Sequence, residues 1–344
     1  MKKISCFALL SLLTVALLVL SGCSLFSPQN QPEILKTYPN DVAPSQAVKT
    51  ESRWVMLHST YGDSNYSISV GESLDSAKDI YSTCDVSIWY FEANENAIVW
   101  CESSSEFYTY KTYTFETQEL ETVFQLAKND KYQPQNIGIH LNTVYYSTID
   151  YESQEVRVIA YDITTKIRTD IIKAEFDETK QPYSINIENE YLSFACSDRV
   201  KVLDLRDDEV VFESSLPETV KYVFTVSYDS INDTCALYYA DENSEDIGIL
   251  KEGDSSIASV FTFSKNRYAY QDKIECYDGH IYWIAQANVS GNITDHYRLI
   301  DYNYLEHKPI ETKRTFNYYR FEDTVYILRF NKGGKFTHID LCQY

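Results

Sequence analysis

The sequence predicts an all-β protein, specifically a seven-bladed β-propeller of four-stranded antiparallel blades. Three observations support this fold class. Short apolar and aromatic strand segments recur about every 45 residues, one repeat contains four strand-like segments, and almost no stretch has the apolar spacing of an amphipathic helix. The composition agrees with it. Hydrophobic residues make up 44%, which suffices for a core, and 30 tyrosines against 10 glycines favour strands.

Residues 1–22 are predicted to be a signal peptide that is removed. Lys2 and Lys3 precede an apolar run at residues 6–20, which is short for a permanent span but typical of a signal-peptide core. The segment 20–23 (LSGC) then resembles the lipobox of bacterial lipoproteins, which implies cleavage before Cys23 and a diacylglycerol on its thiol. We expect a protein anchored by lipid on Cys23 to the extracytoplasmic face of the cell membrane. The alternative is an ordinary secretory signal in which Cys23 is incidental.

The next segment, residues 23–44, is predicted to be a flexible tether, and residues 45–344 the propeller. Four of the eight prolines lie in this short segment, at positions 28, 32, 39 and 44, separated by polar residues. The whole chain has a formal charge of −21, and loss of Lys2 and Lys3 makes the mature chain more negative still. An acidic surface repels nucleic-acid phosphates, so we expect no nucleic-acid partner.

Seven similar segments define the repeat. They are residues 55–57, 98–100, 144–146, 192–194, 237–239, 281–283 and 325–327. Their last residues are separated by 43, 46, 48, 45, 44 and 44 positions. Most of the segments follow polar turn residues such as Asn94–Asn96 and Asp278–Gly279, which suit tight antiparallel hairpins because Asn, Asp and Gly tolerate positive φ. Six nearly equal steps predict seven similar units.

One unit shows four strands, at residues 136–141, 143–149, 156–163 and 167–171. Four strands in about 45 residues match one propeller blade. The repeats resemble divergent bacterial extracytoplasmic propellers, similar in layout to the TolB and YncE-like groups. That resemblance implies an architecture and no activity, because the strong repeat motifs of other propellers are absent.

The last unit ends early, since its third strand reaches residue 341 and only three residues follow. We predict that Glu33–Tyr38, from the N-terminal segment, supplies the missing outer strand. The alternative is that these residues take no part in the fold, as is common near chain ends.

Apolar residues followed by an acid recur with the same period, at residues 115–116, 161–162, 203–204, 300–301 and 339–340. We interpret these acids as turn formers, because a carboxylate at a strand end accepts hydrogen bonds from the backbone of the next turn.

The chain contains none of the sequence fingerprints of common catalytic sites, so we predict no catalytic residue, no metal and no cofactor. Asp241, Asn243, Glu245 and Glu252 have the spacing of a calcium loop, but Asp246 stands where such a loop needs glycine. We therefore expect an acidic hairpin loop there. The six later cysteines are scattered over different repeats, which favours free thiols over disulfides.

Loops that join second to third strands are the candidate ligand face, because loops on a rigid scaffold often carry recognition. The longest are acidic or polar, and their candidate residues are Asp63, Asp150, Tyr151, Glu152, Asp241, Glu242 and Asp246.

The leading functional hypothesis is a non-catalytic lipoprotein whose propeller binds a protein, a peptide or an envelope component. One alternative is an extracytoplasmic polysaccharide hydrolase or lyase, with carboxylates from several blades meeting at the central channel. Another is a cation or small-ligand sensor that uses the acidic loops.

Overall fold

The computed structural model describes residues 32–39, 43–59, 65–128, 132–175, 181–188, 190–196, 198–263, 267–287, 297–311, 315–321, 324–330 and 338–343. The predicted signal peptide and Cys23 lie outside these ranges. All regular elements in the described ranges are strands, and a helix able to cross a membrane does not occur in them.

The chain begins with β1 (Glu33–Pro39), and the first three blades follow it. They consist of β2 (Pro44–Lys49), β3 (Trp54–Ser59), β4 (Tyr66–Gly71) and β5 (Lys78–Thr83); β6 (Ser87–Ala93), β7 (Ala97–Ser103), β8 (Phe107–Thr114) and β9 (Glu119–Ala127); and β10 (Tyr132–His140), β11 (Thr143–Asp150), β12 (Glu155–Asp162) and β13 (Arg168–Glu175).

The later blades have the same order of strands. They consist of β14 (Gln181–Glu188), β15 (Tyr191–Cys196), β16 (Arg199–Asp204) and β17 (Glu209–Ser215); β18 (Tyr222–Asp229), β19 (Thr234–Ala240), β20 (Glu245–Lys251) and β21 (Ala258–Thr262); β22 (Arg267–Tyr277), β23 (His280–Ala287), β24 (Tyr297–Asn303) and β25 (Lys308–Glu311); and β26 (Thr315–Phe321), β27 (Thr324–Phe330) and β28 (His338–Gln343).

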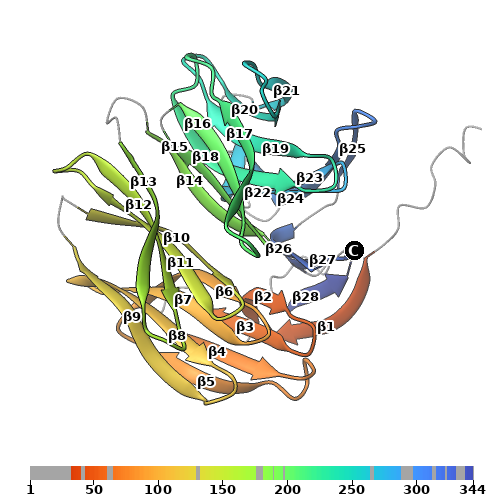
Figure 1. The fold of residues 1–344 in the computed structure, drawn as a ribbon. Helices are drawn as coiled ribbons and strands as arrows, with labels where there is room; N and C mark the ends of the chain where they lie inside the picture. Colours follow the sequence, from red (N-terminus) through yellow and green to blue (C-terminus); the bar gives the residue numbers. More distant parts are fainter. Residues whose placement is uncertain are drawn as a thin grey trace, which may run out of the picture.

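These strands form seven antiparallel four-stranded blades arranged in a ring (Figure 1). A short parallel pairing of β14 with β18 joins the fourth and fifth blades into one continuous sheet. The predicted unit at residues 136–171 corresponds to β10–β13, with strand ends shifted by a few residues. The predicted fold class, a seven-bladed all-β propeller of four-stranded blades, is therefore confirmed.

The ring is closed by the N-terminal strand. β1 pairs antiparallel with β28, with Glu33 opposite Gln343 and Pro39 opposite His338 (Figure 1). The last blade therefore has the order β26, β27, β28, β1, which confirms the predicted outer strand. One boundary needs correction, because residues 33–39 lie within the range 23–44 that we assigned to the tether. Their backbone belongs to the sheet of the last blade.

The two ends of the ring carry different connections. We call the end with the turns between the first and second strands of each blade the inner-turn end. In the last blade Tyr326, near the start of β27, pairs with Gln343, and Gln343 pairs with Glu33. β1 therefore starts at the inner-turn end, and the chain before it leaves from there.

Apolar clusters between neighbouring blades form the core. There are seven of these clusters, one at each junction of the ring. At the junction of the last and first blades, Tyr38 of β1 packs with Met56 and Leu328, and all three side chains are buried. Burial of such side chains contributes about 1.5–3 kcal/mol each, so the closing strand also completes the seventh interface.

A recurring irregularity shapes the innermost strands. Six of the seven, namely β2, β6, β10, β18, β22 and β26, shift register against the second strand. In β6 the shift lies between Trp89 and Phe91, and Tyr90 has a φ of 44°. An extra residue of this kind bends and twists a strand and redirects its side chains.

The turns only partly follow the predicted chemistry. Asp233, Asp278 and Gly279 have the expected positive φ, whereas Leu141 and Lys166 also adopt it. Of the recurring acids, Asp162 and Asp204 accept hydrogen bonds from the backbone of the following turn, as predicted.

Two of these acids were assigned wrongly as turn formers. Asp301 lies 2.6 Å from Nδ1 of His280, and Asp340 accepts a hydrogen bond of 2.7 Å from Oγ1 of Thr37. Both join neighbouring strands: Thr37 lies directly opposite Asp340, and His280 lies two residues from Tyr282, the residue opposite Asp301. Cys84, Cys101, Cys235, Cys276 and Cys342 are free, which confirms the thiol prediction for these five residues.

We predict that loss of β1 destabilises the ring. A chain beginning at residue 43 exposes the edge of β28 and removes Tyr38 from the seventh interface. Its Tm should fall by roughly 5–10 °C, given several kcal/mol lost at about 2–4 °C per kcal/mol. The matched control begins at residue 32 and keeps β1. Equal Tm values for the two chains in a thermal melt would show that closure by β1 is unimportant.

Candidate functional site

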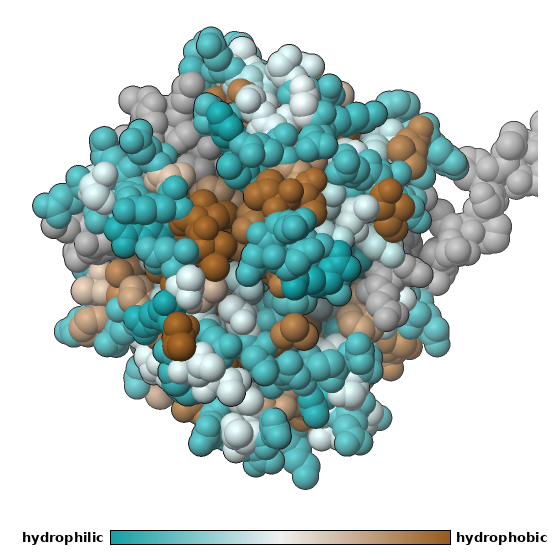
Figure 2. All heavy atoms as spheres, viewed as in Figure 1, coloured by the Kyte–Doolittle hydropathy of each residue, from teal (hydrophilic) through white to brown (hydrophobic). Residues whose placement is uncertain are grey.

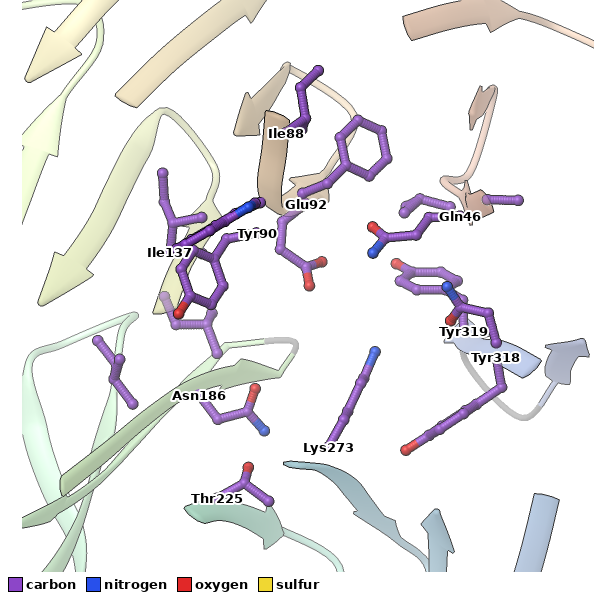
Figure 3. Close-up of a pocket in the computed structure, with 18 of the residues that line it drawn as sticks. Gln46, Ile88, Tyr90, Glu92, Ile137, Asn186, Thr225, Lys273, Tyr318 and Tyr319 are labelled. Carbon is purple, nitrogen blue, oxygen red and sulfur yellow. The ribbon is translucent and has the colours of Figure 1, made fainter. Parts of the chain in front are cut away.

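The innermost strands of all seven blades surround a cavity in the middle of the ring, with a volume of about 370 Å³. Figure 2 shows a mostly hydrophilic surface with hydrophobic residues gathered near the centre of the ring. The polar lining residues are Gln46, Tyr90, Glu92, Asn186, Thr225, Lys273, Asn317, Tyr318 and Tyr319. In Figure 3, Glu92 and Lys273 point toward each other across this cavity, and Gln46 and Asn186 point inward from other blades.

A second cavity of about 470 Å³ continues the first toward the inner-turn end. The two share Glu92, Asn186, Lys273 and Tyr319. They therefore form one channel, and its charged part lies where the inner strands reach their first turns. Glu188, Glu275 and Arg320 line this part.

Two cations meet one carboxylate in the channel. Lys273 Nζ lies 2.8 Å from Glu275 Oε1, and Arg320 Nε lies 3.9 Å from Glu275 Oε2. The side chains of Glu275 and Arg320 are only 8% and 5% exposed. The Arg320 guanidinium also stacks over the Tyr277 ring at 4.3 Å. Such burial is tolerated because each charge faces an opposite charge or a ring face.

Glu92 and Glu188 are in a different situation. Neither forms an ion pair with any residue in the described part of the chain. Ser227 Oγ donates a hydrogen bond to Oε2 of Glu188, while Oε1 is buried without a hydrogen-bond partner among the described residues. Ser227 in turn accepts from the backbone N–H of Cys276 at 2.6 Å, so its position is fixed between two blades.

Desolvation raises the pKa of both carboxyls. Burial, with a smaller effect of Glu275, raises the pKa of Glu92 to about 7, and the charge of Lys273 opposes this rise. Burial and the negative charge of Glu275 raise the pKa of Glu188 to about 8. Both groups thus exchange protons near neutral pH, in the range used by acid–base catalysts and pH-dependent binding sites.

The cations and tyrosines respond to the same surroundings. Burial alone would lower the pKa of Lys273, but Glu275 and Glu92 raise it above the ordinary value. Burial raises the pKa of Tyr318 and Tyr319 well above 10. Lys273 therefore stays charged, while both phenols stay neutral at physiological pH.

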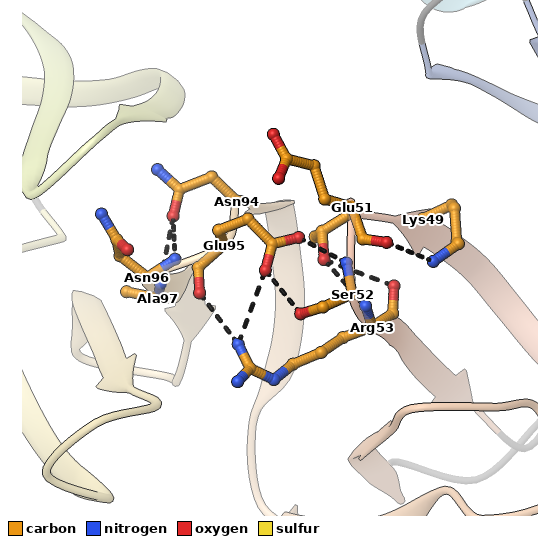
Figure 4. A network of polar contacts seen from close by, with 9 residues as sticks. Lys49, Glu51, Ser52, Arg53, Asn94, Glu95, Asn96 and Ala97 are labelled. Atoms are coloured by element: carbon orange, nitrogen blue, oxygen red, sulfur yellow. Dashed lines mark hydrogen bonds and ion pairs between the residues drawn. The ribbon is translucent and has the colours of Figure 1, made fainter.

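A hydrogen-bond network forms part of the opening (Figure 4). The carboxylate of Glu95 accepts from Ser52 N at 2.7 Å and from Ser52 Oγ at 2.6 Å, and Arg53 Nη1 donates to the Glu95 carbonyl at 2.9 Å. The network links the first two blades across their turns. Burial acts to raise the pKa of Glu95, but these hydrogen bonds and Arg53 outweigh it and lower the pKa.

The described loop residues predicted for the ligand face lie at the opposite end of the ring. Asp150 accepts from the backbone N–H groups of Glu152 and Ser153, and Tyr151 packs at the edge of a core cluster. Asp63 lies outside the described residues, as does Cys23.

The acidic loop after β19 has the same character. Asp241 accepts hydrogen bonds from Asn243 N and Ser244 N, which lower its pKa. Glu242 lies 3.4 Å from Lys221. Asp246 was wrongly assigned to the loop: it is a buried residue of β20 and accepts from Ser259 Oγ at 3.2 Å. This is a hairpin loop whose acids hold its own backbone and neighbouring strands. In the described residues, no group of three or more His, Cys, Asp or Glu side chains is arranged to hold a metal ion.

The sequence analysis missed the charged channel residues Glu92, Glu188, Lys273, Glu275 and Arg320. A signal for them exists. Glu92, Glu188 and Arg320 each stand at or within one residue of the end of the first strand of a blade, just before the turn to the second strand. A charge at this position of an inner strand lies next to the propeller axis.

No family model matches the chain, and no curated protein matches it either. Solved structures are similar at low identity. An acylaminoacyl peptidase from Pyrococcus horikoshii is 11% identical with a TM-score of 0.52, and the match covers 87% of this chain and 51% of the peptidase. This chain thus spans about half of that enzyme.

Two further structures have the same kind of likeness. An oligogalacturonate lyase in complex with manganese is 9% identical with a TM-score of 0.50, covering 91% of this chain and 98% of the lyase. The β-propeller domain of a protease from Pyrococcus furiosus is 12% identical with a TM-score of 0.47, covering 76% and 81%. At such identities the likeness concerns the fold alone. The resemblance to the TolB and YncE-like groups stays a prediction.

We predict that Glu188→Gln changes the pH dependence of stability. A carboxyl with a raised pKa in the folded state stabilises the protein fully below its unfolded pKa of about 4.5, and this stabilisation is lost as the pH rises to about 8. An amide carries no charge to desolvate. Compared with the wild type, the variant should gain Tm at pH 8–9 relative to pH 5.

Thermal melts between pH 5 and pH 9 measure this effect. Glu209→Gln, at an exposed strand end, is the control and should follow the wild type at every pH. A Glu188→Gln curve parallel to that of the wild type would show that Glu188 ionises as it does in water.

Proposed function

We propose that the protein is a lipid-anchored, extracytoplasmic binding protein whose central channel holds a small polar ligand. The observation that carries the proposal is the convergence of polar and charged side chains from different blades on one cavity (Figure 3). Side chains that converge from separate elements, in a concave site with shifted pKa values, are typical of ligand sites.

The channel is a better candidate than the predicted loop face. The acids of those loops already accept hydrogen bonds from their own turns, which is a sufficient reason for their presence. Glu188, by contrast, has a buried oxygen without a partner among the described residues. A buried polar atom left unsatisfied costs about 1–3 kcal/mol, and a ligand that satisfies it gains that energy on binding.

Membrane attachment through Cys23 is part of the proposal and rests on the lipobox-like segment 20–23. Two acyl chains give stable anchoring, whereas one chain is marginal. We propose that the polar group bound in the channel belongs to a protein, a peptide or another component of the cell envelope.

A second candidate function is acid–base catalysis on a polysaccharide. The observation that favours it is that burial brings the pKa of Glu92 to about 7 and that of Glu188 to about 8, where a carboxyl can donate or accept a proton at neutral pH. Shortening of acidic or neutral polysaccharide chains on incubation with the protein, lost in Glu92→Gln, would favour this candidate over simple binding.

The channel proposal predicts binding of a small polar molecule that depends on channel residues. Ethanolamine, glycine, acetate and glucose represent positive, zwitterionic, negative and neutral ligands. At least one should raise Tm, because a ligand of the native state stabilises it by mass action. Asn186→Leu should weaken that binding by about tenfold, the loss of roughly one hydrogen bond.

The control variants are Glu152→Ala and Glu242→Ala in the loops at the opposite end, which should leave the affinity within about twofold. Loss of binding in these variants but not in Asn186→Leu would move the site to the loop face. No stabilisation by any of the four probes would contradict the channel proposal.

The anchoring proposal predicts that Cys23→Ser releases the protein from membranes when it is expressed in a bacterial host that processes lipoproteins. The wild type should partition into the detergent phase, and the variant should not. Cys84→Ser, which removes an exposed free thiol of the propeller, is the matched control and should behave as the wild type. Membrane retention of Cys23→Ser would disprove anchoring through this residue.

A further inference from the structure

We propose that the ligand presents a primary ammonium group to Glu92 and Glu188, and that binding displaces one proton from the channel. This inference rests on the proposed function of the channel as a ligand site. It adds the chemical class of the ligand and a link between binding and pH.

The balance of charge in the channel is the first argument. Its inner part contains three carboxyl groups, Glu92, Glu188 and Glu275, and two cations, Lys273 and Arg320. With all groups ionised, one negative charge is left without a counter-charge. A single proton or a single cationic group of a ligand restores the balance, and the two therefore compete for the same place.

The second argument is that both resident cations are already engaged. Lys273 lies at 2.8 Å from Glu275, with its Nζ also 5.2 Å from the centre of the Tyr318 ring. Arg320 lies between Glu275 and the ring of Tyr277. Lys273 thus pairs with Glu275 of its own strand, and Arg320 faces Glu275 of the neighbouring blade. The excess negative charge therefore resides on Glu92 and Glu188.

The third argument concerns hydrogen bonding. Oε1 of Glu188 is buried without a hydrogen-bond partner among the described residues, and so is Oε2 of Glu275, a residue only 6% exposed. An ammonium group has three N–H donors and no acceptor, which suits a site rich in carboxylate oxygens. A quaternary ammonium has the same charge but no donor, so the site should distinguish the two.

The aromatic residues of the channel also favour binding of a positively charged group. Tyr318 and Tyr319 both lie within about 6 Å of Lys273 Nζ, so this part of the channel already presents ring faces to a positive charge. Burial keeps both phenols neutral, and they therefore add no negative charge that a proton could cancel.

Several charged and titratable groups surround Glu92 and Glu188 and influence where the displaced proton comes from. Lys273 and Glu275 of β22 and Tyr318, Tyr319 and Arg320 of β26 face Glu92 and Glu188. Of the other charged or titratable groups that line the second cavity, Glu51 and Glu95 lie in the turns after β2 and β6, and Lys49 and His140 are the last residues of β2 and β10. Glu188 is the group most resistant to ionisation, because burial and Glu275 both act against its charge. We assign the displaced proton to it.

The test uses ethanolamine as the probe and choline as its quaternary counterpart. Calorimetry at pH 7.5, in two buffers with different protonation enthalpies, should show release of up to one proton per bound ethanolamine. The affinity for ethanolamine should fall by about tenfold between pH 8 and pH 6.5, since protonation of the carboxyl competes with the cation. Choline should bind at least about fivefold more weakly.

Glu188→Gln should abolish proton release and weaken ethanolamine binding by tenfold or more. Glu92→Gln provides a second variant should the first not fold. His307→Gln is the matched control, because His307 is an exposed histidine in the turn between β24 and β25 and is not among the residues that line the two cavities, and it should keep proton release.

Equal binding of choline and ethanolamine would overturn the inference, as would ethanolamine binding without proton release. Stabilisation by acetate or glucose alone would overturn it while leaving the channel proposal standing. Failure of all four small probes named above would overturn both.

Discussion

The packing of each blade against its neighbours is the interaction on which the structure depends. A four-stranded sheet has two apolar faces, and only a closed ring covers both faces of every blade. The seven clusters between blades meet this need, and the last of them exists only because Tyr38 of β1 packs beside Met56 and Leu328. β1 and β28, the first and last strands of the described residues, therefore hold each other in place.

Ring closure also determines the chemistry of the centre. Side chains on the innermost strands that point toward the axis meet side chains from the other blades. These neighbours reduce their access to water. Charged residues placed there are desolvated, and their ionisation is governed by their neighbours. Glu275 faces both Lys273 and Arg320, whereas burial leaves Glu92 and Glu188 to hold protons near neutral pH.

The fold was predictable because its cause is repeated in the sequence. Seven strand segments at a period near 45 residues recur from Val55–Leu57 to Val325–Ile327, and the shortened last unit pointed to Glu33–Tyr38 as its partner. The site was less predictable. Glu92, Lys273 and Arg320 are far apart in the sequence, and only the ring brings them together. Among 51 acidic residues, those on the axis look like those in turns unless their place within the repeat is considered.

The start of β1 at the inner-turn end has a consequence for how the molecule stands on a cell. Nine residues lie between Cys23 and Glu33, and the ten steps from one to the other span at most about 35 Å. If Cys23 carries the proposed lipid, this short segment holds the inner-turn end of the ring close to the membrane. The charged end of the channel opens at that same end. The opposite end, with its acidic hairpins, would then point away from the bilayer. Molecules embedded in the membrane, or lying along its headgroups, would meet the charged mouth first.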